Sequence, residues 1–370
     1  MTHTIRAAVQ WAIGEKWTVE AVELHEPQED EVLVEIKASG LCHSDDHNVT
    51  GDFPSAVPVV GGHEAAGVVR AVGTRVTRVA VGDRVIVYPI PACGKCAWCS
   101  AGRGYLCDMN AWVMAGHAPD GHYRFAKNGA GIGSYSQVGG FAEQTVVSEN
   151  HVIKIDNDIP FPVAAIVACG FSTGYGSAVN VAGVRPGDTV AVVGVGGVGT
   201  GAVQGAYISG AANIVAIDPK EPRRQAILGF GATDAAEDID QAAAIIAAQT
   251  GNVMADHVIV TAGVVTGELI GAATKLVGKG GKLTVTGVPP HYETEIPMPV
   301  SEYIMYNRSI GGNVWGGTRA YWDIPRILRL YRRGRLKLDE MISHTYSLDQ
   351  INDGYADMHA GKNTRGVIVF

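Results

Sequence analysis

The stretch from Thr189 to Asp218, TVAVVGVGGVGTGAVQGAYISGAANIVAID, decides the fold of this chain. A short β-branched apolar run is followed at once by Gly194, Gly196 and Gly199 in the spacing G-x-G-x-x-G. Gly194 allows a tight turn, Gly196 lets the backbone approach a pyrophosphate, and Gly199 lets the next helix pack closely on its strand. The first amides of that helix point at the phosphates. The stretch therefore predicts a dinucleotide-binding strand, turn and helix.

A second apolar run, Asn213 to Ile217, ends in Asp218, where a carboxylate binds the ribose hydroxyls of NAD. An acid here repels the extra phosphate of NADP and favours NAD, although Lys220, Arg223 and Arg224 lie close by and weaken that preference. The glycine spacing alone is a weak signal in a chain with 48 glycines, and an ordinary strand-turn-helix is the alternative. The ordered succession of strand, glycines, helix, strand and acid favours the nucleotide site.

Length and charge limit the class of protein. The chain has 370 residues, too many for a single core, and fits two domains. A formal net charge of -8 without a long single-sign run argues against nucleic acid or an anionic membrane as partner. No apolar stretch reaches the roughly 18 residues that span a bilayer, and the N-terminus lacks the apolar segment of a signal peptide. We expect a cytoplasmic protein that acts on a small molecule.

The chain falls into two parts that differ in their pattern of apolar residues. Short alternating strands up to about residue 155 predict an all-β, partly closed module. From Arg185 onward strands alternate with helices, as in a doubly wound parallel sheet. The expected strands are 5–9, 31–37, 66–72, 83–87, 140–147 and 152–155 in the first part, and 189–193, 213–217, 256–260 and 282–285 in the second.

Two further regions, one before residue 140 and one after residue 316, can also be interpreted from the sequence. The segment from Asp108 to Gln137 is predicted to be a long loop that rims a site or mediates contact between subunits. The tail after residue 316 is predicted to hold one amphipathic helix, Trp322 to Arg333, and a final strand from Arg365 that folds back onto the first part.

Six cysteines are present, and four of them are crowded together. Cys93, Cys96, Cys99 and Cys107 form a C-x2-C-x2-C-x7-C series. Four thiolates in a tetrahedron suit a closed, structural zinc site. An iron–sulfur cluster is the first alternative, but bacterial ferredoxins place the fourth cysteine after three residues and follow it with proline. Disulfides are the second alternative, which a reducing cytosol disfavours.

Cys42 and His63 are further residues of the zinc-ligand type. They lie in two connecting segments of the β module, Gly40 to His47 and Gly61 to Glu64. Taken singly, each is more often a buried thiol or a hydrogen-bonded histidine than a ligand.

The motifs together resemble the zinc-dependent medium-chain alcohol dehydrogenases over nearly the whole chain. The resemblance rests on GLCHSDDH at 40–47, GGHEAAGVV at 61–69, the four-cysteine lobe, CGFSTGYG at 169–176, GVGGVG at 194–199 and the terminal RGVIVF. The long loop before residue 140 is similar to that of the dimeric animal-type and glutathione-linked enzymes, and bacterial nicotinoprotein alcohol dehydrogenases are also similar.

The resemblance implies an α/β protein in which a GroES-like, β-barrel-like catalytic domain is built from both chain ends and a Rossmann domain is inserted between them. The implied ranges are 1–172 for the catalytic domain, with a zinc lobe at about 91–109, 173–314 for the NAD-binding domain, and 315–370 for the returning segment.

The resemblance also implies a set of site residues. Cys42, His63 and Cys169 hold a catalytic zinc with an open position, Glu64 lies behind it as an alternative ligand, and Asp45 accepts from the second nitrogen of His63. Ser44 accepts the alcohol proton and passes it through the cofactor ribose to His47. The implied NAD-binding residues are His43, Thr173, Gly194, Gly196, Gly197, Val198, Gly199, Asp218, Arg223 and Arg365.

The implied chemistry is hydride transfer between a primary or secondary alcohol and NAD, giving an aldehyde or ketone. Zinc lowers the pKa of the alcohol, as it does for water. The implied cofactors are NAD and two zinc ions per chain, one catalytic and one structural, and the implied assembly is a homodimer. His43 and Pro89 depart from the family pattern, at positions where relatives place an arginine and an aromatic residue that narrows the substrate pocket. A pocket that admits larger alcohols follows as a hypothesis.

Three alternatives remain open at this point. A nicotinoprotein keeps NAD bound and regenerates it with a second substrate or an electron acceptor. A thiol-adduct formaldehyde dehydrogenase needs an anion-binding pocket. A non-catalytic NAD-binding scaffold is disfavoured because the open metal site, the first feature to erode without catalysis, has all its residues.

Overall fold

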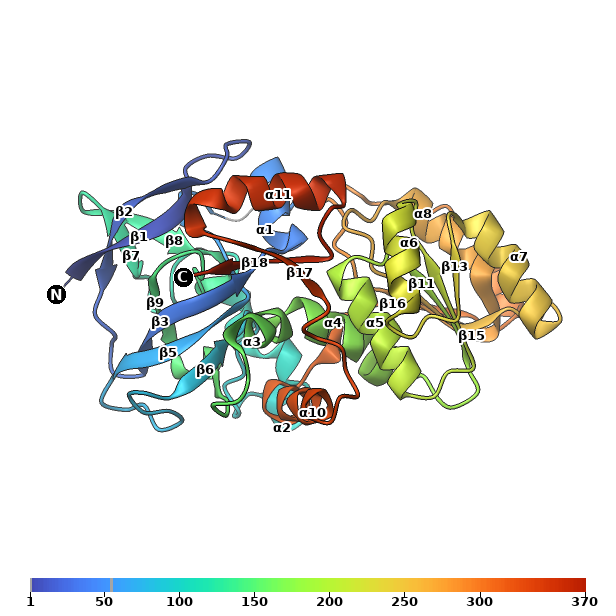
Figure 1. Cartoon of the computed structure of the whole chain (residues 1–370), viewed down its shortest axis with the longest axis horizontal. Helices are drawn as coiled ribbons and strands as arrows, with labels where there is room; N and C mark the ends of the chain where they lie inside the picture. The colour runs from blue at the N-terminus through green and yellow to red at the C-terminus, as the bar shows by residue number, and fades with distance from the viewer. Residues whose placement is uncertain (1, 54–55) are drawn as a thin grey trace. The chain divides into compact units, whose positions relative to one another are not determined.

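The computed structural model describes residues 2–53 and 56–370 (Figure 1). Contacts between residues divide the chain into two compact units. Unit 1 comprises Met1–Cys169, Arg319–Arg332 and Leu338–Phe370, and unit 2 comprises Gly170–Thr318 and Arg333–Lys337.

Unit 1 is built from a small barrel and a second sheet. The closed barrel has the strand order β1-β2-β7-β8-β4, and the sheet has the order β10-β6-β5-β3-β18-β17, with β9 also paired to β3. The barrel strands are β1 (Thr2–Gln10), β2 (Thr18–His25), β7 (Phe125–Lys127), β8 (Ala130–Ser134) and β4 (Val59–Val60). The sheet strands are β10 (Val152–Lys154), β6 (Arg84–Val87), β5 (Ala65–Val72), β3 (Glu31–Gly40), β18 (Arg365–Val369), β17 (Ile342–Tyr346) and β9 (Gln144–Ser148).

The C-terminal strand completes the sheet of unit 1. β18 pairs antiparallel with β3, with Val367 opposite Gly40, and parallel with β17. Figure 1 shows β18, in red, beside the blue β3. The expectation that the last strand folds back onto the first part of the chain is confirmed by this pairing.

Two expectations about connecting regions are wrong. The segment 108–137 is not a continuous loop, because it contains β7 and β8, which close the barrel. These strands have only three and five residues, too few to show a period of two in the sequence. The tail holds a second helix, α11 (Ile351–Ala360), besides the expected α10 (Ala320–Arg332).

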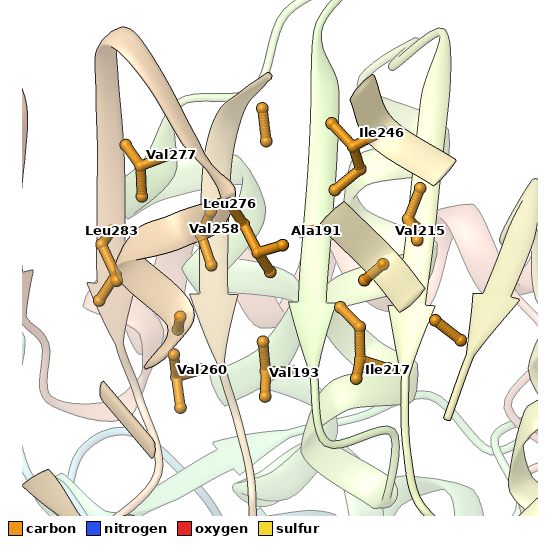
Figure 2. Packing of buried hydrophobic residues seen from close by; sticks show 14 of the residues in the cluster. Ala191, Val193, Val215, Ile217, Ile246, Val258, Val260, Leu276, Val277 and Leu283 are labelled. Carbon is orange, nitrogen blue, oxygen red and sulfur yellow. The ribbon is translucent and has the colours of Figure 1, made fainter. Parts of the chain in front are cut away.

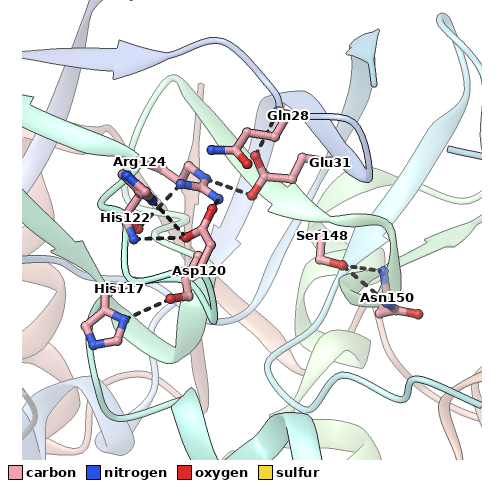
Figure 3. Close-up of polar contacts among 9 residues, drawn as sticks. Gln28, Glu31, His117, Asp120, His122, Arg124, Ser148 and Asn150 are labelled. Carbon is pink, nitrogen blue, oxygen red and sulfur yellow. Dashed lines mark hydrogen bonds and ion pairs between the residues drawn. The ribbon is translucent and has the colours of Figure 1, made fainter. Parts of the chain in front are cut away.

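Polar contacts fix the start of the β7–β8 hairpin. Arg124 is buried, and its guanidinium donates to Glu31 at 2.7 Å and to Asp120 at 2.7 Å (Figure 3). A cavity of about 320 Å³ lies beside this cluster, lined in part by His25, Gln28 and Arg124. It contains no residue of the predicted site.

Unit 2 is a six-stranded parallel sheet with the order β13-β12-β11-β14-β15-β16, the arrangement of a doubly wound nucleotide-binding fold. Its strands are β11 (Thr189–Val193), β12 (Asn213–Ile217), β13 (Asp234–Ala236), β14 (Ala255–Val260), β15 (Val277–Val285) and β16 (Ser309–Gly312). The predicted bounds of β11 and β12 are those observed.

Helices cover the sheet of unit 2 and bury an apolar core. They are α4 (Gly170–Gly176) with a π-helical continuation (Ser177–Ala182), α5 (Gly197–Ile208), α6 (Glu221–Leu228), α7 (Ile239–Thr250), α8 (Gly267–Ala273) and α9 (Val300–Met305). Figure 2 shows Val193, Ile217 and Val260, from three neighbouring strands, in one cluster with Ile246 of α7. Continuous β-branched runs suit such strands because parallel sheets are buried on both faces.

The described ranges include no single helix that is long and apolar enough to cross a membrane. One bent pair of helices, Phe161–Ala168 with Gly170–Ala182, is long and apolar enough when taken together, by length and composition only.

Candidate active site and cofactor site

The first predicted ligand, Cys42, immediately precedes a short polar helix. Helix α1 (His43–Thr50) begins after Cys42, which occupies the N-cap position in an extended conformation. The helix buries polar residues, with Asp45 fully buried and His47 3% exposed. Because buried polar groups need partners, these side chains face other polar groups of unit 1.

His63 is held by one of these buried residues. Its Nδ1 lies 2.9 Å from Oδ2 of Asp45, while Oδ1 of Asp45 accepts from the amide of Gly62 at 2.8 Å. His63 is 2% exposed, and its Nε2 has no hydrogen-bond partner. Burial lowers the pKa of His63, but the charges of Asp45, Cys169 and Cys42 outweigh it and raise that pKa well above the usual value.

Cys169 joins this pair from a distant part of the chain. It follows α3 (Phe161–Ala168), an apolar helix packed inside unit 1, and its thiol hydrogen-bonds to Cys42 and interacts with His63. The bond from Cys169 and the charge of His63 hold the pKa of Cys42 well below its usual range, against the effect of burial. The same bond and burial raise the pKa of Cys169 well above its usual range.

A buried ion pair lies beside the thiols. Glu64 is fully buried and Arg365, from β18, is 4% exposed, and the guanidinium contacts the carboxylate directly. Glu64 also lies with Cys42 and His63 in a group whose ligand atoms are all within 4.8 Å of one another. A methyl group on Gly40 would lie 2.2 Å from Oε2 of Glu64, so only glycine leaves room for this pair.

Ser44 and His47 occupy one side of α1, three residues apart. The hydroxyl of Ser44 lies 3.7 Å from the Cys42 sulfur, and Nδ1 of His47 lies 3.4 Å from Asp52. His43 is half-buried at the start of the helix, with its ring 6.4 Å from that of His47.

Tyr135 also contacts this centre and was not predicted from the sequence. Its hydroxyl donates to the carbonyl of Ser44 at 2.6 Å, and its ring lies 5.6 Å from the His63 ring. It follows β8 within the segment predicted to be loop, where neither spacing nor residue type distinguished it from other aromatic residues.

The donor set fits zinc. Two thiols and an imidazole are the Cys2His set of catalytic zinc sites, and the buried His63 ring interacts with both thiols. The contact between Asp45 and Nδ1 leaves Nε2 as the nitrogen that faces the thiols.

The four clustered cysteines also converge. The sulfurs of Cys93 and Cys99 are 4.0 Å apart, and those of Cys96 and Cys107 are 3.9 Å apart. Four sulfurs at ~2.3 Å from one zinc ion are separated by about 3.8 Å in a regular tetrahedron. Cys93 and Cys96 accept further bonds from the amides of residues 95, 96 and 99, which stabilise thiolates. All six cysteines of the chain are free, so the disulfide alternative is wrong.

The glycine-rich turn of unit 2 has the expected geometry. Gly194 has φ = 85°, and a methyl group there would lie 2.6 Å from Ala262. A methyl group on Gly199 would lie 2.0 Å from the carbonyl oxygen of Gly194, so α5 packs close to its strand. At Gly196 a methyl group would meet only Arg223, at 3.9 Å. Protein packing therefore does not require glycine at 196, which leaves that backbone open to a ligand's phosphates.

Asp218 lies at the end of β12 and is 3% exposed. Its carboxylate accepts from the amides of Val195 at 3.1 Å and Lys220 at 2.9 Å. Arg223 lies 3.6 Å from the same carboxylate. The hydrogen bonds of Asp218 thus connect the glycine-rich turn to the end of β12.

Thr173 and Val198 lie in the two helices, α4 and α5, that pack closely against each other at Gly174. Thr173 is in α4 and Val198 in the first turn of α5, and a methyl group on Gly174 would lie 1.8 Å from the carbonyl oxygen of Val198. Gly197 begins α5.

Comparison with known proteins gives the family. Residues 28–157 match the family model described as "Alcohol dehydrogenase GroES-like domain", and residues 197–331 match "Zinc-binding dehydrogenase". The chain is 42% identical to an NDMA-dependent alcohol dehydrogenase of Amycolatopsis methanolica, with 98% of each chain covered. It is 43% identical to alcohol dehydrogenase B of Mycobacterium tuberculosis, with 98% of this chain and 97% of the relative covered.

A solved structure extends the likeness to three dimensions. The benzyl alcohol dehydrogenase of Acinetobacter calcoaceticus superposes with a TM-score of 0.92 at 28% identity, with 100% of this chain and 99% of that chain covered. The expectations of the GroES-like and Rossmann fold classes are confirmed. The chain belongs to the zinc-dependent medium-chain alcohol dehydrogenase family and is an alcohol oxidoreductase whose cofactors are zinc and a nicotinamide dinucleotide.

Proposed function

We propose that Cys42, His63 and Cys169 hold the catalytic zinc of this alcohol dehydrogenase, with Glu64 as an alternative ligand. The observation that carries the proposal is the convergence of the buried His63 ring and the thiols of Cys42 and Cys169. Zinc bound there supplies a Lewis acid that polarises the alcohol oxygen and lowers the pKa of its proton.

The chain's own residues then hold and move the proton. Asp45 fixes the His63 ring, so that Nε2 and not Nδ1 is available to the metal. The Ser44 hydroxyl, near the Cys42 sulfur, would accept the alcohol proton, and His47 would be the residue that finally holds it. Asp52, 3.4 Å from His47, stabilises the imidazolium that results.

The glycine turn of unit 2 would hold the dinucleotide, whose nicotinamide would supply the hydride acceptor for the alcohol. Asp218 binds the ribose of NAD and disfavours NADP. The full set that we assign to the cofactor is His43, Thr173, Gly194, Gly196, Gly197, Val198, Gly199, Asp218, Arg223 and Arg365.

We assign larger alcohols, including aromatic ones, as the substrate class. Pro89 replaces the aromatic residue that narrows the pocket in relatives, and the Acinetobacter structure with the same fold is named for benzyl alcohol. Ethanol as a better substrate than every bulky or aromatic alcohol would contradict this assignment.

Retained NAD is a second candidate for the catalytic cycle. The relative from Amycolatopsis methanolica is named for its dependence on NDMA, which favours regeneration of the nicotinamide by an acceptor. Purified protein that carries one nicotinamide per chain and does not reduce added NAD would select this candidate. Protein that is free of nucleotide and reduces added NAD would reject it.

We further propose a structural zinc at the four-cysteine lobe, a homodimer and a cytoplasmic location. β16 ends the sheet of unit 2 with one unpaired edge, and Ile304 and Met305 of the adjoining α9 are 75% and 78% exposed, which supports association through this face. Six free cysteines support a reducing compartment. Sedimentation of the purified protein as a monomer would contradict the dimer.

Metal analysis of paired variants tests the two zinc sites. Wild type is expected to hold two zinc ions per chain. Cys42→Ser is expected to retain one zinc and its circular dichroism spectrum but to lose alcohol oxidation. Cys96→Ser serves as the matched control, because it removes a thiol from the lobe and leaves the catalytic ligands intact. Unchanged zinc content and turnover in Cys42→Ser would refute the assignment.

A further inference from the structure

Three polar side chains of unit 2 meet although they come from three different elements. Ser177 begins the π-helical segment after α4, Thr286 follows β15 and Asn313 follows β16. Ser177 is completely buried, and the other two are half-buried. They lie at the carboxyl ends of the parallel strands, the edge at which ligands bind in sheets of this kind.

The hydrogen bonds among these side chains form a network that ends on the carbonyl oxygen of Thr173, and the Ser177 hydroxyl also lies 3.5 Å from Oδ1 of Asn313. Nδ2 of Asn313 can only donate, and it lies 2.9 Å from the Thr286 hydroxyl. The Thr286 hydroxyl donates to that of Ser177 at 2.9 Å. The Ser177 hydroxyl donates in turn to the carbonyl oxygen of Thr173 at 2.7 Å. Chains of this kind polarise each successive bond, so that loss of one link weakens the rest.

The other end of the chain fixes the loop after β16. The amide of Gly316 donates to Oδ1 of Asn313 at 2.9 Å. Trp315, Gly316 and Gly317 follow with φ values of 52°, 64° and 61°. A positive φ is costly for a residue as large as Trp315, so this loop needs contacts that hold it in place. A methyl group on Gly316 would lie 2.3 Å from the carbonyl oxygen of Thr173, so the loop and α4 touch directly.

We infer that Ser177, Thr286 and Asn313 are positioning residues for hydride transfer, acting through Thr173. The inference rests on the proposed function, in which Thr173 binds the cofactor, and it places Thr173 against the nicotinamide ring. The hydrogen-bond network and the loop fix the backbone of Thr173 from two sides, and so would set the position of that ring. Displacement of reacting groups by about 1 Å can cost on the order of 100-fold in rate.

A back-bond from a helical serine to the carbonyl four residues earlier is common and has no functional meaning alone. Here the serine hydroxyl also accepts from Thr286, a residue more than a hundred positions away. Apolar side chains could hold α4, β15 and β16 together without a buried network in which every donor and acceptor needs a partner. The hydrogen bonds fix the orientation of these elements, which apolar packing does not.

Thr286→Val tests the inference, because it keeps the shape of the side chain and removes only the middle hydroxyl. The matched control is Thr284→Val, two residues earlier, where the hydroxyl is buried and has no hydrogen-bond partner. Thr286→Ser restores the hydroxyl and is the rescue. Asn313→Asp, which cannot donate to Thr286, is a second break in the chain should Thr286→Val not fold.

Three measurements are made on each purified protein: the single-turnover rate of nicotinamide reduction by benzyl alcohol, its primary deuterium isotope effect, and the rate at which NADH leaves the protein. Thr286→Val is expected to lower the single-turnover rate by about 10-fold, within the range for a small misplacement. It is also expected to raise the isotope effect and speed NADH release, and Thr286→Ser is expected to reverse all three changes.

Equal values in Thr286→Val and Thr284→Val would overturn the inference, as would a loss of thermal stability in Thr286→Val without change in the three measurements. Failure of the proposed function looks different, because wild type itself would then neither bind NADH nor oxidise benzyl alcohol.

Discussion

Replacing Arg365 by methionine tests how the buried pair beside the active site is stabilised. Arg365 is 4% exposed and Glu64 is fully buried, and their side chains are in direct contact. Methionine fills much of the same volume without a charge. The variant therefore leaves the Glu64 carboxylate buried with no counter-charge in contact with it.

The expected loss of stability is large. Two unit charges about 4 Å apart interact by about 4 kcal/mol at an effective dielectric constant of about 20. Removal of one partner from a buried pair costs about 3–5 kcal/mol. We expect a loss in this range for Arg365→Met at pH 10, where the Glu64 carboxyl of wild type is ionised, and a fall in Tm of about 10 °C. The double variant Glu64→Gln with Arg365→Met carries no buried charge at this pair and is expected to recover most of the loss.

The loss also depends on pH in a defined direction. Burial raises the pKa of Glu64 to about 8, opposed by Arg365, from an ordinary value of 4.5. A carboxyl whose pKa is raised in the folded state favours folding below its unfolded pKa, and that contribution is lost as pH rises through the folded value. Wild type and variant both lose this contribution as pH rises from about 4.5 to about 8. Without Arg365 the folded pKa rises further, so the variant goes on losing stability above about pH 8, and its deficit relative to wild type grows there. The double variant is expected to show no such slope.

Urea unfolding, followed by circular dichroism at pH 7 and pH 10, measures both effects. Zinc content is determined for each protein, so that loss of metal is separated from loss of the ion pair. A single variant that is as stable as wild type, or a double variant that is no more stable than the single one, would refute the reasoning.

Three more predictions follow from single contacts. Asp218→Asn removes the charge and keeps only one of the two bonds from backbone amides, because its amide nitrogen cannot accept. The dissociation constant for NADP should fall by about tenfold, or ~1.4 kcal/mol, in fluorescence titrations, and an unchanged preference for NAD would show that the charge does not select the cofactor. Gly174→Ala places a methyl group 1.8 Å from the carbonyl oxygen of Val198 and should destabilise unit 2 by about 3 kcal/mol or more in thermal unfolding. In the control variant Gly311→Ala the methyl group meets nothing within 4 Å, so stability should change little. Tyr135→Phe removes the bond to the Ser44 carbonyl and should cost about 1 kcal/mol of stability and lower kcat for alcohol oxidation; wild-type kcat in this variant would exclude a role for the hydroxyl.

The parallel sheet could be read from the sequence because its strands are buried on both faces. β11 and β12 are continuous β-branched runs bounded by glycine, aspartate and asparagine, so their limits are visible without the structure. The barrel hairpin of β7 and β8 could not be read in this way, since strands of three and five residues show no period and their pairing partners lie far away in the chain.

The active site shows a second limit. Helix α1 has no apolar stripe, because it buries Asp45, His47 and other polar residues, and so gives no helical signal in the sequence. Residue types pointed to Cys42 and His63 as ligands, but their approach to Cys169 follows from three separate elements and was implied by family resemblance, not by spacing. The ligand roles and the predicted domain bounds stay predictions.

The pairing of β18 with β3 has a consequence for the order in which the protein assembles. All of unit 2 precedes residues 338–370 in the chain, so during synthesis it leaves the ribosome before they do. Its sheet can therefore form while translation continues. Unit 1 must wait, because the strand that supplies Arg365 is translated after unit 2, and until that strand emerges β3 lacks its neighbour β18. A polypeptide that lacks residues 338–370 should accordingly bind nucleotide through unit 2, while its unit 1 stays incompletely folded and bound by chaperones.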